Sequence, residues 1–262
     1  MALKIAVCIK RTPASTSVAV DAAGKVQTKG LPHGINPFDE YAVEEALRLK
    51  EKLGGTVTVV SAGEAEAEEV IRAALALGCE EGVLLSDPAF AGSDSSVTAS
   101  ILAAALRKAG AQLAVFGKET NDGASGAMPA FTAAWLDWPS AVGVRKVAAA
   151  SDSEVTVERL MEDGVDTLTL KLPAVLGVTK EINEPRLPSL KGKMAAKKAP
   201  VQKWGAAELG LDPAKLGAAA SPTEVVAMEA VPSRPAGTVI SGATPEDKAK
   251  ALVEKLREAK FI

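Results

Sequence analysis

The sequence predicts an α/β fold in which a parallel, Rossmann-like sheet lies between two layers of helices. In the N-terminal half, short apolar runs alternate with segments whose apolar residues recur at helical spacing. Each apolar run is continuous rather than alternating, as in strands that are buried on both faces. Regular alternation of strand and helix is typical of a doubly wound sheet, so we expect three layers, α/β/α.

The apolar runs expected to form buried strands are Leu3–Ile9, Thr56–Ser61, Gly82–Ser86 and Leu113–Gly117. The helices expected between them are Phe38–Leu53, Ala65–Leu77 and Ser95–Ala109, and a fourth is expected in the small-residue segment Ala127–Ala134. The first helix has the clearest ends, because Asn36 suits its N-cap, Pro37 its first position and Gly54 its stop. Along the chain, each expected strand is therefore followed by an expected helix.

The remaining segments are expected to extend this sheet. A hairpin should pair Val18–Val20 with Lys25–Thr28 around a turn at residues 21–24. Antiparallel additions to the sheet are expected at Val142–Ala149, Glu154–Arg159, Thr167–Leu172 and Ala174–Thr179. The segment Glu184–Lys203 contains proline and many lysines, and we expect it to be irregular.

The C-terminal part is expected to form an arm. Residues 204–235 are rich in Ala, Pro and Gly, and Pro245–Lys260 predicts an amphipathic helix with Leu252, Val253 and Leu256 on one side. We therefore divide the chain into an α/β domain, 1–203, and an arm, 204–262. The arm is expected to pack on another protein, and the alternative is that it wraps its own domain.

Composition limits the function classes. A net charge of −3 and a pI near 5.5 disfavour nucleic acid and anionic membranes as general partners. Cys8 and Cys79 lie far apart in apolar runs, which favours reduced, buried thiols and an intracellular compartment. No signal-peptide pattern opens the chain, and no apolar run is long enough to span a bilayer, so we expect a soluble protein.

The polar, glycine-bearing loop Gly117–Gly126 is the main functional signal. It follows a buried strand and leads into a helix, so its backbone N–H groups and the helix N-terminus favour an anionic ligand such as a nucleotide phosphate. An ordinary strand-to-helix connection would use the same residue types. Ligands of doubly wound sheets bind where the strand order reverses, which would bring Cys8–Lys10 to this loop, with Asn36–Asp39 and Ala62–Gly63 nearby.

Catalytic patterns are scarce. His33 is the only histidine, which argues against a catalytic triad and a multi-histidine metal site, so we expect a loop histidine. The carboxylates in Glu44–Glu51 and Glu64–Glu69 are expected on solvated helix faces. Neither a G-x-G-x-x-G nor a P-loop motif is present. The sequence therefore favours a binder or carrier over an enzyme.

Several segments, taken in order along the chain, resemble the electron transfer flavoprotein β subunit. They are Val7–Arg11, Asn36–Ala46, Gly117–Lys118, Leu136–Pro139, Leu170–Val175 and Asn183–Arg186. The resemblance covers nearly the whole chain, and no single motif carries it. It implies an adenine nucleotide α-hydrolase-like fold and a subunit without its own catalytic constellation.

The resemblance also implies partners and cofactors. The family forms a heterodimer with an α subunit, which holds most of a redox-active FAD near the interface, and many β subunits bind AMP structurally. Electrons pass from flavoprotein dehydrogenases, notably the acyl-CoA dehydrogenases of fatty acid oxidation, to a membrane quinone reductase. No metal site is implied, and the expected compartment is the bacterial cytoplasm or, in a eukaryote, the mitochondrial matrix.

The resemblance further implies particular site residues. The AMP contacts carried over by position are Cys8, Asn36, Pro37, Phe38, Asp39, Ala62, Gly117, Lys118, Asn121, Asp122, Gly123, Ser125, Gly126, Ala127 and Met128. Some relatives have acidic and amide side chains where this chain has Gly123, Ala124, Gly126 and Ala127, so backbone N–H groups must make those contacts. Ser15 stands roughly where an aromatic residue of some relatives approaches the flavin.

The segment 183–198 resembles the recognition loop of the family, in which an exposed leucine, here Leu190, anchors the subunit on the dehydrogenase. The alternative for this leucine is packing within the loop. Two other functions stay open. One is the flavin-bifurcating branch of the family, whose β subunit carries a second FAD in the AMP position. The other is a stand-alone adenine-nucleotide enzyme or sensor, although S-G-G-x-D-S and glycine-rich phosphate motifs are missing.

Overall fold

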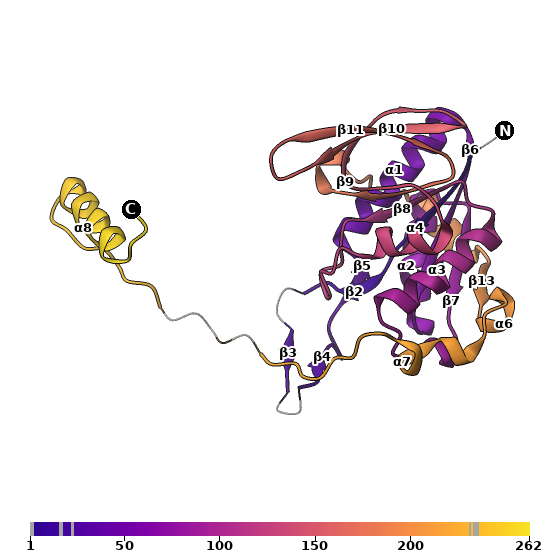
Figure 1. The fold of residues 1–262 in the computed structure, drawn as a ribbon, viewed down its shortest axis with the longest axis horizontal. Helices are drawn as coiled ribbons and strands as arrows, with labels where there is room; N and C mark the ends of the chain where they lie inside the picture. The colour runs from indigo at the N-terminus through magenta and orange to yellow at the C-terminus, as the bar shows by residue number, and fades with distance from the viewer. Residues whose placement is uncertain (1–2, 16–17, 22–23, 231, 233–235) are drawn as a thin grey trace.

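A large, mostly parallel sheet organises the α/β body of the protein (Figure 1). The computed structural model describes residues 3–15, 18–21, 24–230, 232 and 236–262. Within these residues the main sheet has nine strands, in the order β11-β10-β9-β12-β8-β1-β6-β7-β13. Their bounds are β1 Leu3–Cys8, β6 Gly55–Ala62, β7 Glu81–Leu85, β8 Leu113–Gly117, β9 Ser140–Ala150, β10 Glu154–Leu160, β11 Val165–Lys171, β12 Ala174–Val178 and β13 Val201–Trp204.

Strand direction changes only toward one edge of this sheet. Each neighbouring pair from β13 through β7, β6, β1, β8 and β12 to β9 is parallel. β10 is antiparallel to β9 and to β11. The expectation that Ala174–Thr179 is an antiparallel addition is therefore wrong, because β12 lies parallel to both of its neighbours and is buried throughout, like the other central strands.

Helices cover both faces of the sheet, which confirms the doubly wound, three-layer prediction. α1 (Pro37–Leu53), α2 (Glu68–Leu77) and α5 (Leu190–Lys198) pack on the face that receives Ile5 and Val7 of β1. α3 (Ser95–Ala109), α4 (Met128–Leu136) and α6 (Ala206–Leu209) pack on the other face, with Ala6 and Cys8. Successive residues of a strand point to opposite faces, so β1 contributes to two separate cores.

Short elements complete the body. The expected hairpin is present as β3 (Ala19–Val20) and β4 (Val26–Gln27), while residues 22–23 of its turn lie outside the described residues. A second small antiparallel pair, β2 (Arg11–Pro13) and β5 (His33–Ile35), was not predicted. The 3₁₀ turns are η1 Ala65–Ala67, η2 Pro88–Phe90, η3 Lys180–Ile182 and η4 Pro213–Lys215. The helix expected from Ala65 thus begins with a 3₁₀ turn.

The expectation of an irregular segment Glu184–Lys203 is wrong, because this segment contains both α5 and β13. α5 starts where the Ser189 hydroxyl accepts a hydrogen bond from the Gly192 amide. Gly192 also allows a close approach to α2, since a Cβ there would overlap the Ala76 carbonyl. Tertiary packing therefore stabilises a helix that its composition alone does not predict.

The C-terminal part first follows the body and then leaves it. Trp204, Ala206 and Leu216 are buried in the core beside α3, and α7 (Gly217–Ala220) follows. The predicted terminal helix is present as α8 (Pro245–Glu258), where Thr244 and Asp247 form a capping box. No residue of α8 is buried, and Figure 1 shows it apart from the body. Within the described residues, no helix has the length and apolarity needed to span a membrane.

Candidate functional site

The strand order reverses beside β1, which has β6 on one side and β8 on the other. The chain proceeds from β1 to β6 and β7 on one flank and then returns to β8 on the opposite flank. The carboxyl ends of β1, β6 and β8 therefore meet at the point where ligands of doubly wound sheets bind. These ends carry Cys8, Ala62 and Gly117, three of the predicted site residues.

Asp39, in the first turn of α1, ties two of these strand ends together. Its Oδ2 accepts a hydrogen bond from the Lys10 amide at 2.8 Å, and its Oδ1 accepts one from the Gly117 amide at 3.2 Å. Burial raises the pKa of Asp39 to about 7, although these hydrogen bonds favour the charged form. The carboxyl group therefore changes its protonation state near neutral pH.

Gly117 is required at its position because Asp39 approaches it so closely. A Cβ on Gly117 would overlap both the Asp39 carboxyl oxygen and the backbone of Phe38 and Asp39. The first turn of α1 thus packs directly on the end of β8. This contact explains why the loop begins with glycine.

Asn36 holds the loop that follows β8. Its Nδ2 donates to the Glu119 carbonyl at 2.8 Å, and its Oδ1 accepts from the Asn121 amide at 3.0 Å. The side chain is fully buried and makes no capping hydrogen bond to the backbone of α1. Asn36 therefore occupies the N-cap position, as predicted, while its side chain fixes loop 117–126 instead of capping the helix.

Loop 117–126 is also bonded to the segment that follows β1. Lys10 Nζ and Asp122 Oδ2 form an ion pair at 2.7 Å, and Asn121 Nδ2 donates to the Pro13 carbonyl at 3.0 Å. The Lys10 ammonium was not among the predicted site residues, although Cys8–Lys10 was expected to lie near the loop. The sequence signal that could have indicated Lys10 is a lysine close after the end of a central strand.

The start of α4 suits an anionic group. In the part of the chain that the structure describes, the amides of Gly126, Met128 and Ala130 donate to no protein atom. Gly126 and Ala124 have positive φ angles, +62° and +46°, so the backbone curls just before the helix. Free amides at a helix N-terminus are the usual protein ligands of phosphate. The residues present therefore fit a nucleotide phosphate held by backbone groups.

The other predicted contact residues lie in the same region, and the Lys118 amide donates a hydrogen bond to the Val178 carbonyl of β12 at 2.8 Å. Pro37 is exposed and Phe38 half-buried in the first turn of α1, while Lys118, Gly123 and Ser125 are exposed on the loop. Ala127 lies directly before α4, and its amide is 3.5 Å from the Ser125 hydroxyl. Exposed loop atoms of this kind are available to a ligand.

Cys8 and His33 show no catalytic arrangement. Burial, with a smaller effect from the nearby Asp39 carboxylate, raises the pKa of the Cys8 thiol far above its ordinary value. The neutral thiol is a poor nucleophile. His33 lies at the start of β5, not in a loop as expected, and its Nδ1 lies 2.9 Å from the Leu31 carbonyl. Among the described residues, no cluster of His, Cys, Asp and Glu could hold a metal ion.

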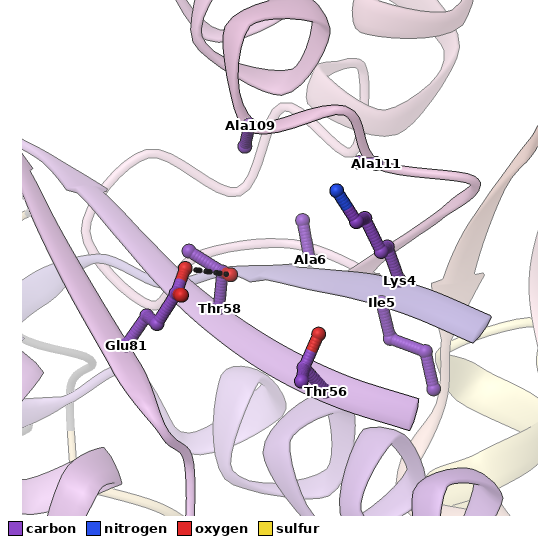
Figure 2. Close-up of a pocket in the computed structure, with 8 residues that line it drawn as sticks. All are labelled: Lys4, Ile5, Ala6, Thr56, Thr58, Glu81, Ala109 and Ala111. Atoms are coloured by element: carbon purple, nitrogen blue, oxygen red, sulfur yellow. Dashed lines mark hydrogen bonds between the residues drawn. The ribbon is translucent and has the colours of Figure 1, made fainter. Parts of the chain in front are cut away.

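A small cavity of about 60 Å³ lies at the opposite end of the strands (Figure 2). Lys4, Thr56 and Glu81 contribute its polar groups, and the Thr58 hydroxyl donates to Glu81 at 3.1 Å. This volume admits water but not a nucleotide. The cavity therefore does not compete with the carboxyl ends of the strands as a nucleotide site.

Comparison with known proteins identifies the family. The model of the electron transfer flavoprotein domain matches residues 23–209, well over half of the chain. The electron transfer flavoprotein subunit beta of Thermoanaerobacterium thermosaccharolyticum is 39% identical over 99% of this chain and 100% of its own length. The chain belongs to the electron transfer flavoprotein β-subunit family. Membership assigns it an electron-transfer role and an α subunit as partner.

Other β-subunit relatives span the chain equally well. The subunit beta of Bacillus subtilis is 35% identical over 99% of this chain and 100% of its own length. The CarD subunit of the caffeyl-CoA reductase–Etf complex of Acetobacterium woodii is also 35% identical, with the same coverage. The similarity therefore includes the C-terminal arm as well as the α/β body.

In this β-subunit chain, Leu190 lies at the first position of α5 and is 77% exposed. It lines an open hollow of about 620 Å³ with Lys191, Met194, Ala195 and Lys198. Leu187 and Met194 are also exposed. Leu190 is therefore presented to solvent by a helix, not packed within a loop. Ser15, the predicted flavin neighbour, is half-buried, and residues 16–17 beside it lie outside the described residues.

Proposed function

We propose that this chain forms a heterodimeric electron transfer flavoprotein that carries electrons from flavoprotein dehydrogenases, such as acyl-CoA dehydrogenases, to a quinone reductase. FAD lies at the interface and is held mainly by the α subunit. This chain supplies docking and scaffolding rather than catalysis. Family membership and the hydrogen-bonded loop at the end of β8 support the proposal.

AMP is the nucleotide proposed for the carboxyl ends of the strands in this chain. The observation that carries this choice is the group of unpaired amides at the start of α4, which fits a single phosphate. Asn36 and Asp39 hold the loop in the shape that presents these amides. AMP binding would stabilise the subunit by binding only its folded form.

The second candidate is a flavin-bifurcating protein with another FAD in the AMP position. The favouring observation is the full-length similarity to CarD, whose name places it in a caffeyl-CoA reductase complex. Both candidates need phosphate contacts at the same loop, so the bound nucleotides must decide between them. A stand-alone nucleotide enzyme or sensor ranks below both, and ATP turnover by the purified chain would support it.

The deciding experiment is to co-express the chain with its α subunit, denature the complex and quantify the released nucleotides. One FAD and one AMP per heterodimer would support the electron carrier. Two FAD and no AMP would support the bifurcating protein. Failure to form a complex, or a complex without flavin, would contradict the proposed function.

Leu190 is proposed to anchor the subunit on the dehydrogenase. A single exposed apolar side chain can contribute much of the energy of a loose contact. We predict that Leu190→Ala slows electron transfer from an acyl-CoA dehydrogenase about tenfold at low donor concentration. Flavin content should stay unchanged. Leu160→Ala, an exposed leucine of β10, is the control, and an unaltered rate in Leu190→Ala would contradict the anchor.

The arm, residues 204–262, is proposed to pack on the α subunit. Leu252 and Val253 of α8 are exposed in this chain, and apolar residues on one side of a helix usually face a partner. The division at residue 203 and the cytoplasmic or mitochondrial-matrix location stay predictions.

A further inference from the structure

α5 carries little that would stabilise a helix by itself. It is only nine residues long, contains Gly192, and has four lysines and no acidic residue. Isolated helices of this length are marginal in water, and glycine and like charges weaken them further. The position of α5, and of the exposed Leu190 at its start, therefore depends on contacts with neighbouring elements.

Arg186 holds the chain just before α5. Its Nε donates to Glu44 Oε2 at 2.7 Å, its Nη2 donates to Glu44 Oε1 at 3.1 Å, and its backbone amide also donates to Glu44. The same guanidinium forms an ion pair with Glu51, farther along α1. Arginine forks bound to two carboxylates fix orientation as well as distance.

Glu44 is well suited to this contact because it is almost completely buried, at 4% exposure, contrary to the solvated position expected from the sequence. Burial raises the pKa of Glu44, but hydrogen bonds from Arg186 and Arg48 outweigh this effect and leave the pKa below its ordinary value. A buried carboxylate needs such partners. Glu45, also buried, accepts a hydrogen bond from Asn183, which precedes Arg186.

Arg72 of α2 holds the other end of α5. Its Nη1 donates to the carbonyls of Ala196 at 2.7 Å and Ala199 at 3.2 Å. Glu68, one turn earlier on α2, accepts two hydrogen bonds from the same guanidinium and fixes its direction. The last carbonyls of a helix lack partners within the helix, so this arginine both caps α5 and attaches it to α2.

We propose that Arg186 and Arg72 are positioning residues that hold α5 in one orientation, so that Leu190 and Met194 meet a dehydrogenase as a preformed surface. This inference rests on the proposed function of α5 in docking. Ordering a flexible segment during binding weakens affinity, whereas a segment that is already ordered avoids that loss. Both arginines bond to other segments of this chain, and they act through the helix between them.

The test uses the heterodimer and combines two measurements. Hydrogen–deuterium exchange of peptides covering residues 187–199 reports the order of α5 without any partner. Steady-state electron transfer with an acyl-CoA dehydrogenase as the varied donor reports KM and kcat. For Arg186→Ala we expect faster exchange in these peptides and a KM raised about tenfold, with kcat and flavin content unchanged. Arg72→Ala should give the same pattern, with faster exchange concentrated near residue 199.

Two matched variants sharpen the result. Arg48→Ala removes the second arginine that forms an ion pair with Glu44. Because Arg48 and Glu44 both lie in α1, this ion pair does not hold α5, so hydrogen exchange and KM should match those of the unmodified protein. Arg186→Lys keeps the charge without the fork, so its exchange and KM should be intermediate.

Unchanged exchange in Arg186→Ala would overturn the inference, and so would faster exchange with an unchanged KM. A KM raised by Arg186→Ala but not by Leu190→Ala would uphold the positioning role while removing Leu190 from the contact. The failure of the anchor and the failure of the positioning role are thus distinguishable.

Discussion

Two buried polar side chains at the carboxyl ends of the strands each bond to two backbone groups. Asn36 uses its amide nitrogen and oxygen on two backbone groups of one loop, and Asp39 uses its two oxygens on the ends of two strands. A buried polar atom without a partner destabilises the fold, so these contacts leave few alternative arrangements. The hydrogen bonds of these two side chains therefore favour one conformation of the loop.

Asp39 should make stability depend on pH. Its pKa is about 7 in the folded chain and about 3.9 when unfolded, so the folded state binds more protons between these values. Stability from the protonated group is present below about pH 4 and is lost as pH rises through about 7. The free energy of unfolding, relative to Asp39→Asn, should thus fall over this range by a few kcal/mol at most.

Urea unfolding of both proteins across this pH range measures that difference. Asp163→Asn, which makes the same carboxyl-to-amide change at an exposed position between β10 and β11, is the control. A difference between the unmodified protein and Asp39→Asn that rises with pH would contradict the burial argument. It would mean that the backbone hydrogen bonds dominate.

Gly117→Ala tests the close approach of α1 to β8. The added methyl group would overlap Asp39 and the backbone of Phe38, neither of which can move without disturbing α1. We expect a loss of about 2–4 kcal/mol in the free energy of unfolding, as for other changes that force atoms into a packed site. Gly123→Ala is the control, because a Cβ there meets only the Thr120 hydroxyl at an ordinary 3.5 Å. Equal stabilities of the two variants would refute the close packing.

Among the helices, α3 shows how an N-cap can also attach the C-terminal segment. Asp94 Oδ1 accepts from the amides of Ser96 and Val97, and Oδ2 accepts from the amide and hydroxyl of Thr223. The same carboxylate therefore caps α3 and binds the chain after α7. These hydrogen bonds help to lower the pKa of Asp94 despite the opposing effect of desolvation.

Asp94→Ala should lower the free energy of unfolding by about 1–2 kcal/mol, the usual effect of losing an N-cap. Thr223→Val removes only the hydroxyl contact to the same carboxylate, so its effect on global unfolding should be smaller. Thermal unfolding measures both variants. If Thr223→Val destabilises the protein as much as Asp94→Ala does, the capping role of Asp94 is refuted.

The strands and helices were predictable where a single segment carries its own signal. The continuous apolar runs predicted β1, β6, β7 and β8, and proline and glycine indicated the ends of α1. α5 was not predictable, because Arg72 and the Ala76 backbone stabilise it from another part of the chain. The parallel direction of β12 also depends on a crossover that no local pattern reveals.

The meeting of the strand ends at the candidate site was predictable, but the contacts between their side chains were not. Strand order alone indicates that the ends of β1 and β8 meet, because that order follows from the alternation of elements. The Asn36 side chain bonds to loop 117–126 instead of capping α1, because the fold brings these two segments, far apart in the sequence, close together. The burial of Glu44 likewise depends on Arg186, far away in the sequence.

Across the chain, α1 connects the two regions for which a function is proposed. Its first turn holds loop 117–126 through Asp39, and its later turns hold the approach to α5 through Glu44 and Glu51. The proposed nucleotide site at one end and the proposed docking helix at the other are therefore attached to the same helix. The arm, by contrast, reaches beyond the body, and α8 contributes no buried residue.

Removing α8 would test separately whether this helix stabilises the α/β body and whether it binds the α subunit. A chain ending at residue 243 loses a helix that is not buried in this structure, so its thermal unfolding should lie within a few degrees of the full chain. If the exposed Leu252 and Val253 pack on the α subunit, the shortened chain should form far less heterodimer and retain less FAD. Leu252→Ser with Val253→Ser in the full chain should reproduce that loss, whereas Lys248→Ser, on the same helix, should not. Normal assembly of the shortened chain would show that α8 does not hold the partner, and a large fall in the melting temperature would show that α8 packs on its own body.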